Sequence, residues 1–165
     1  MSRSSSDASG PAAEPDLATA VGWAADDAEL TAGLCELYAS ADAAMAPWRH
    51  ECEACGRCCR LQEFGHRLYV STAELALLLR EPPPTGPTPE RCPYQAGRLC
   101  TARPRRTLGC RTFFCRPDLA DATRALHERF HAELRRLHEA RRIAYRYVEL
   151  VCGIAAVRDA GVRIG

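Results

Sequence analysis

Residues 52–59 read Cys-Glu-Ala-Cys-Gly-Arg-Cys-Cys, and this CxxCxxCC stretch is the feature around which the rest of the chain must fold. Four further cysteines follow, so that eight of the ten cysteines fall between residues 52 and 115. Free thiols oxidise and exchange, and cysteines at this density therefore indicate either disulfides or a soft metal ion held by thiolates.

The N-terminal sequence favours metal over disulfides. Residues 1–20 lack the run of ~7–15 apolar residues that a secretory signal needs. No stretch approaches the ~18 apolar residues that span a bilayer. We therefore expect a cytoplasmic protein that does not associate with a membrane. Thiols stay reduced in the cytoplasm, which favours metal binding over disulfides. A disulfide scaffold is the alternative if the chain is exported by another route.

The spacing of the first cysteines suits metal ligation. Cysteines two residues apart can turn both sulfurs toward one ion, and Gly56 can take the positive φ of such a tight turn. A third sulfur at the same period, Cys58, is similar to the ferredoxin run that holds an iron–sulfur cluster, and Cys92-Pro93 is similar to the remote Cys-Pro ligand. We expect Cys59, directly after Cys58, to point elsewhere and to serve a separate site or act as a reactive thiol.

We predict that all eight cysteines of this region bind metal. The candidate ligands are Cys52, Cys55, Cys58, Cys59, Cys92, Cys100, Cys110 and Cys115. Two four-ligand sites are possible, and one grouping places Cys52, Cys55, Cys58 and Cys92 together and the remaining four in the second site. The triplet spacing and the Cys-Pro pair favour an iron–sulfur (4Fe-4S) cluster over zinc or iron ions.

Arginine surrounds these cysteines. Residues 52–60 and 91–116 contain a single acid, Glu53, and nine arginines: Arg57, Arg60, Arg91, Arg98, Arg103, Arg105, Arg106, Arg111 and Arg116. Arginine lowers the pKa of nearby thiols and offsets the negative charge of a sulfur-rich centre. A nucleic-acid surface is the alternative, but interleaved stacking aromatics are missing, so we do not expect a nucleic-acid partner.

Histidine gives weaker indications. His66 is an alternative ligand, although a surface or hydrogen-bonding role is favoured. His127 and His131 have the i, i+4 spacing that can hold zinc, but they lack an HExxH context.

The segments on either side of the cysteines predict amphipathic helices. Residues 26–45 predict a helix capped by Asp26 or Asp27, with Cys35 as a small buried hydrophobe beside its apolar stripe, which consists of Leu30, Leu34, Leu37, Ala41 and Met45. Residues 67–70 predict a short strand, and Ser71 with Glu74 forms a capping box that starts another helix. Residues 82–89 form a proline-rich linker. A long helix is predicted after residue 118, and residues 143–151 fit either its continuation or a strand.

These patterns predict an α+β, mainly α fold, with an irregular metal-stapled cysteine core and flanking amphipathic helices. Residues 1–16 are too polar and small to order themselves and predict a disordered tail. Residues 17–165 predict one domain, in which residues 52–116 form the cysteine cluster and residues 117–165 a C-terminal helical region.

Residues 50–116 resemble the bacterial CxxCxxCC cysteine-cluster family (YkgJ-like proteins). The resemblance rests on ECEACGRCCR at residues 51–60 and RCPYQAGRLCTARPRRTLGCRTFFC at residues 91–115, where all eight cysteines fall on family cysteine positions. Family members are described as zinc- or iron-chelating or iron–sulfur-cluster-containing proteins, and a related cysteine region accompanies flagellin lysine methylation in some proteins. Thr101 and Ala102 depart from the family, which commonly has a bulky residue and Tyr there.

We therefore expect a metal-binding protein in metal or electron handling. Catalysis on an organic substrate is not expected, since the sequence has no base–nucleophile motif, P-loop or GxGxxG. The alternatives are a zinc-stapled module that binds nucleic acid or protein, and an accessory subunit of a modifying enzyme. A protein partner of unknown identity is compatible with each.

Overall fold

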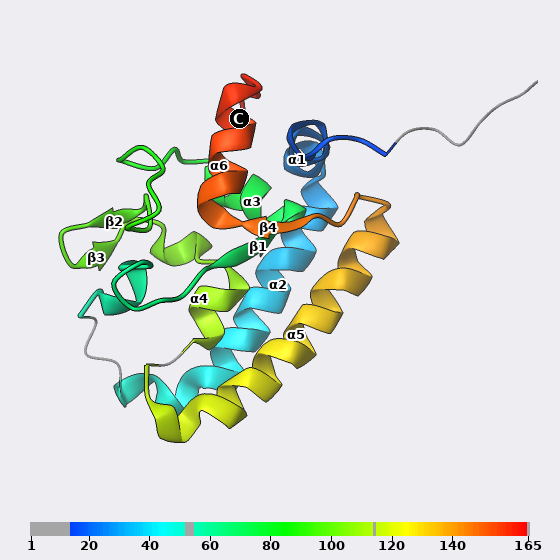
Figure 1. Ribbon diagram of the computed structural model, residues 1–165. Coiled ribbons are helices and arrows are strands. Elements are labelled where there is room, and N and C mark those ends of the chain that lie inside the picture. The colour runs from blue at the N-terminus through cyan, green and yellow to red at the C-terminus, as the bar shows by residue number, and fades with distance from the viewer. Residues whose placement is uncertain (1–13, 52–54, 114, 165) are drawn as a thin grey trace, which may run out of the picture.

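The computed structural model describes residues 14–51, 55–113 and 115–164. Its α-helices are α1 (Leu17–Asp26), α2 (Ala28–Met45), α3 (Thr72–Leu79), α4 (Leu108–Thr112), α5 (Ala120–Arg141) and α6 (Leu150–Asp159). Its strands are β1 (Tyr69–Ser71), β2 (Gln95–Ala96), β3 (Leu99–Cys100) and β4 (Tyr147–Glu149), and 3-10 helices cover Ala46–Glu51, Arg57–Cys59, Arg103–Arg105 and Pro117–Leu119. The predicted α+β, mainly α class is confirmed (Figure 1).

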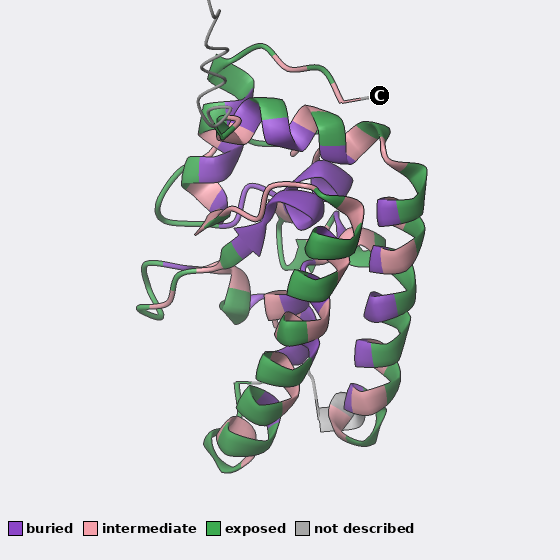
Figure 2. Ribbon diagram, turned by 90° about the vertical axis from the view of Figure 1, so that its right-hand side faces the viewer, coloured by how far each residue is buried: buried purple, intermediate pink, exposed green. Residues whose placement is uncertain are grey.

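The two long helices, α2 and α5, lie side by side (Figure 1). The whole apolar stripe that predicted α2 is buried, and Asp27 caps the helix by accepting a 2.8 Å hydrogen bond from the Leu30 N–H. Phe130 and Leu134 are buried on α5. Figure 2 shows that the exposed residues lie on the outer faces of the long helices. Cys35 is exposed, so the prediction that it is a buried hydrophobe is wrong.

An additional helix, α1, precedes the first predicted one and packs against α3. Asp16 caps α1, because its Oδ1 accepts a 2.7 Å hydrogen bond from the Thr19 N–H. Arg146 forms a 3.0 Å ion pair with Glu14. The folded chain therefore extends back at least to residue 14, ahead of the predicted boundary at residue 16. Residues 1–13 of the predicted tail lie outside the described residues.

Strands β1 and β4 form an antiparallel pair, in which Tyr69 lies opposite Glu149 and Ser71 opposite Tyr147. The segment 143–151, for which the sequence left two possibilities, forms β4 and then turns directly into α6. The predicted capping box is confirmed, since Ser71 and Glu74 exchange hydrogen bonds at the start of α3. Both β1 and β4 therefore lead straight into a helix.

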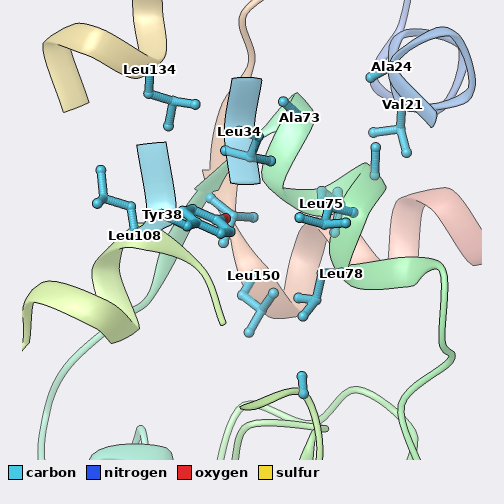
Figure 3. Close-up of a cluster of buried hydrophobic side chains, with 14 of the residues drawn as sticks. Val21, Ala24, Leu34, Tyr38, Ala73, Leu75, Leu78, Leu108, Leu134 and Leu150 are labelled. Carbon is cyan, nitrogen blue, oxygen red and sulfur yellow. The ribbon is translucent and has the colours of Figure 1, made fainter. Parts of the chain in front are cut away.

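Helix α3 lies at the centre of the core. Residues 72–78 are all buried, and Leu75 and Leu78 belong to a connected cluster of buried side chains to which all six helices contribute (Figure 3). Tyr38 of α2 and Leu150 of α6 approach the same centre (Figure 3). None of the helices that the described residues form is both long and apolar enough to cross a bilayer.

Candidate metal centre

The two cysteine segments lie against each other, although the proline-rich linker separates them in sequence (Figure 1). The Cys92 N–H donates a 2.8 Å hydrogen bond to the Cys59 carbonyl oxygen. The Gln95 Nε2 donates a 3.0 Å hydrogen bond to the Gly56 carbonyl oxygen. The first segment is the 3-10 helix Arg57–Cys59, and the second forms the β2–β3 hairpin. These bonds bring cysteines from both segments into one region.

Five of the eight candidate ligands interact with one another there. The Cys58 and Cys59 thiols lie close enough to shift the pKa of each other, and Cys92 and Cys100 lie close enough to raise the pKa of Cys59. Cys110, on α4, lies close enough to the others for their charges to raise its pKa. The five residues, called the thiol cluster below, are Cys58, Cys59, Cys92, Cys100 and Cys110.

Cys58 and Cys59 lie closer together than expected. Their side chains were expected to point apart, yet each thiol shifts the pKa of the other. The 3-10 turn is the physical reason, because it coils the chain more tightly than an extended segment would. The division of the ligands into two four-cysteine sites stays a prediction.

Burial and mutual contact disfavour thiolates in the metal-free cluster. The neighbouring Cys59 raises the pKa of Cys58, and burial raises it further. The neighbouring Cys58 lowers the pKa of Cys59, but Cys92 and burial outweigh this effect and bring the pKa to about 12. Burial raises the pKa of Cys110 to about 12. A metal cation shared among these sulfurs would stabilise several thiolates side by side.

The remaining three candidate ligands are placed differently. Cys55 is half-buried just before Gly56, and Cys115 is exposed beyond the end of α4. The structure does not connect either of them with the thiol cluster through a described hydrogen bond. Cys52 lies outside the described residues.

All nine described cysteines are free thiols. Within residues 14–51, 55–113 and 115–164, no group of three or more His, Cys, Asp or Glu side chains is arranged to hold a metal ion. The thiols of the cluster therefore meet in one region without already surrounding a common point.

A buried carboxylate fixes the helix that carries Cys110. The Glu74 Oε1 accepts hydrogen bonds from the Leu108 N–H at 2.7 Å and from the Tyr38 hydroxyl at 3.3 Å, while Oε2 accepts from the Ser71 N–H at 2.8 Å. Burial raises the pKa of Glu74. The sequence identified Glu74 only as the cap of α3. The hydrogen bond between Glu74 and Leu108, the first residue of α4, joins two segments that are far apart in the chain. A local sequence pattern does not predict such a contact.

Arg111 holds the loop before α4 in place. Its guanidinium donates hydrogen bonds to the Pro104 carbonyl at 2.6 Å and the Arg106 carbonyl at 2.7 Å, and it pairs with Asp42 at 2.5 Å. The same group lies 4.1 Å from the centroid of the Tyr38 ring. Arg111 was predicted as part of the positive charge around the sulfurs, and it acts in the structure as a buried link to α2.

Other arginines around the cysteines are also paired with carboxylates. Arg60 pairs with Glu63, Arg105 with Glu81, and Arg116 with Asp118. These acids, like Asp42, lie outside residues 52–60 and 91–116. The nine arginines and one acid of those two segments therefore overstate the positive charge around the cysteines. Arg106 is close to the thiol cluster, where its charge partly offsets the rise in the pKa of Cys58.

The chemistry of the region fits a soft metal better than its geometry does. Thiols from three chain segments supply the sulfur ligands that iron–sulfur clusters and zinc prefer. Gln95 Oε1 and Arg106 Nε, beside the cluster, are buried and have no hydrogen-bond partner among the described residues. Unpaired buried polar atoms are uncommon in folded proteins, and a bound group or water would satisfy them.

The histidines are engaged by other groups. His66 Nε2 lies 3.2 Å from the Cys58 carbonyl oxygen, in the hydrogen-bonding role favoured over ligation. The rings of His127 and His131 are 5.5 Å apart, but His127 contacts the Thr112 hydroxyl at 2.9 Å and His131 contacts the Tyr145 hydroxyl.

Gly56 offers a test of the contact between the two segments. Its φ is +73°, and a Cβ there would lie 2.7 Å from the Arg98 carbonyl oxygen. We expect Gly56→Ala to lower the free energy of unfolding by about 2–4 kcal/mol, from backbone strain and steric conflict together. Gly65→Ala is the matched control, because Gly65 has φ +63° with nothing within 4 Å, and it should cost only about 1–2 kcal/mol. Equal losses in urea unfolding would contradict the close approach.

Comparisons with known proteins returned no match: no family model, no curated protein and no solved structure matches the chain.

Proposed function

We propose that the protein binds a metal centre through its cysteines, with an iron–sulfur cluster favoured over zinc or iron ions. The ligands would come from Cys52, Cys55, Cys58, Cys59, Cys92, Cys100, Cys110 and Cys115. The observation that carries the proposal is the thiol cluster, to which three separate segments contribute. Packing of the apolar core does not by itself explain why thiols from three segments lie close together, whereas metal binding would.

Binding would require the thiols to turn toward a common centre. Cys58 and Cys59 sit on a single short turn, and Cys100 ends a two-residue strand, so only short segments need to adjust. Cys110 differs, because Glu74 and Arg111 fix its helix against the core. We propose that α4 is the rigid wall of the centre and that the first cysteine segment closes on it.

The bound group would determine the physiological role. An iron–sulfur cluster would supply one-electron chemistry, whereas zinc would act as a structural cross-link. We propose a role in metal or electron handling, in line with the zinc- or iron-chelating or iron–sulfur proteins of the CxxCxxCC family that the chain resembles, and we propose the cytoplasm as its location. The ion pairs of Arg60, Arg105 and Arg116 leave less free positive charge for a nucleic acid, which supports metal binding over the alternative of a nucleic-acid module.

Anaerobic purification of the full chain, with elemental analysis and a visible spectrum, tests the proposal. Iron with acid-labile sulfide and a broad visible band would establish the favoured cluster. A colourless protein with about one or two zinc ions per chain would establish the structural alternative. Protein that contains neither metal, and that takes up neither after anaerobic reconstitution, would refute metal binding.

A further inference from the structure

A cavity of about 590 Å³ lies between the proline-rich linker and the C-terminal end of the chain. Its volume is within the range of small-molecule sites. Its walls are largely apolar: prolines 82–84 form one side, and the other lining residues include Leu79, Val157, Val162 and Ile164. None of its lining residues is a cysteine, so the cavity is separate from the thiol cluster.

Two arginines supply the charge of this cavity. Arg158, near the end of α6, and Arg163, in the tail beyond it, both line the cavity and are exposed. No acidic residue lines the cavity, and neither arginine forms an ion pair with an acid in the described part of the chain. The Arg158 guanidinium extends toward the linker, since a Cβ placed on Gly86 would lie 4.0 Å from its Nη1.

We propose that this cavity binds an apolar chain that ends in a single anionic head group, such as a medium-chain carboxylate. The chain would remove apolar surface of the prolines, Leu79 and Val162 from water. The carboxylate would accept hydrogen bonds from Arg158 and Arg163, whose planar guanidinium groups match its two oxygens. A cationic head group would meet two like charges, and a neutral one would leave both arginines without a counter-charge.

Binding of decanoate to the full chain, measured by calorimetry below the micellar concentration, tests this proposal. We expect saturable binding of one decanoate per chain, and a loss of affinity of about tenfold or more in Arg158→Glu/Arg163→Glu. Arg124→Glu/Arg136→Glu is the matched control, because it makes the same charge change on the exposed face of α5 and should bind like the wild type. Decanol and decyltrimethylammonium should bind more weakly than decanoate.

Free carboxylates and anionic membrane lipids both have an apolar chain and an anionic head group. A second experiment distinguishes between them. Co-sedimentation with phosphatidylcholine vesicles that contain phosphatidylglycerol should leave the protein in the supernatant. Sedimentation with vesicles in the absence of decanoate binding would overturn the proposal. So would equal affinity in the two double variants, or equal affinity for decanol.

Discussion

Cys92→Ser is expected to abolish stable metal binding. Cys92 is the most buried member of the thiol cluster, its N–H donates a hydrogen bond to the Cys59 carbonyl oxygen, and its thiol lies close enough to raise the pKa of Cys59. Serine keeps the size of the side chain but replaces the soft sulfur ligand with a hydroxyl, which binds iron and zinc poorly at neutral pH. We expect the metal content of the anaerobically purified variant to fall by about tenfold or more. Its free energy of unfolding should fall by roughly 3–4 kcal/mol through loss of the bound ligand.

Two comparisons separate loss of metal from loss of packing. Cys35→Ser and Cys152→Ser are matched controls, because both cysteines are exposed and lie outside the thiol cluster, so metal content should be unchanged. After metal removal with a chelator, the stability gap between Cys92→Ser and the wild type should largely close. Full metal content in Cys92→Ser, or a gap that chelation leaves intact, would contradict the role assigned to Cys92.

Glu74→Ala should be among the most destabilising single substitutions in the core. The alanine would leave the N–H groups of Ser71 and Leu108 buried without their acceptor and would remove the partner of the Tyr38 hydroxyl. Buried donors without acceptors cost about 1–3 kcal/mol each, so we expect a loss of about 3–5 kcal/mol in urea unfolding. Metal content should fall as well, because the helix that carries Cys110 would lose its anchor.

Glu74→Gln and Glu128→Ala complete this test. Glutamine keeps the shape and one acceptor oxygen, so it should cost roughly half as much as alanine. Glu128 is exposed on α5, and its replacement should change stability by less than about 0.5 kcal/mol. If Glu74→Ala matched Glu128→Ala, the carboxylate would not be the link between α3 and α4.

Much of the helical structure could be predicted from local patterns. The stripe from Leu30 to Met45, the cap at Asp27 and the box at Ser71 and Glu74 each depend on residues within a few turns of one another. The sequence did not predict α1, because three of its four buried residues are alanines, which give a weak periodic signal: Ala18, Ala20 and Ala24. The pairing of β1 with β4 could not be predicted for a different reason. Each strand has three residues, and its partner lies in a distant part of the chain.

The candidate site was predictable in composition and not in arrangement. Cysteine spacing identifies the candidate ligands but does not predict that Cys92 lies beside Cys59, to which its N–H donates a hydrogen bond. The arginines show the same limit, since the acids that pair with Arg105 and Arg111 come from elsewhere in the sequence. Such pairings depend on tertiary packing, which brings together segments that the sequence keeps apart.

X-ray absorption at the metal edge of the anaerobically purified protein tests the central claim most directly. The account predicts a first shell dominated by sulfur at about 2.3 Å in the wild type and in Cys35→Ser, and little or no signal at the metal edge in Cys92→Ser. A first shell made only of nitrogen and oxygen atoms would contradict it, because the thiol cluster would then not hold the bound metal.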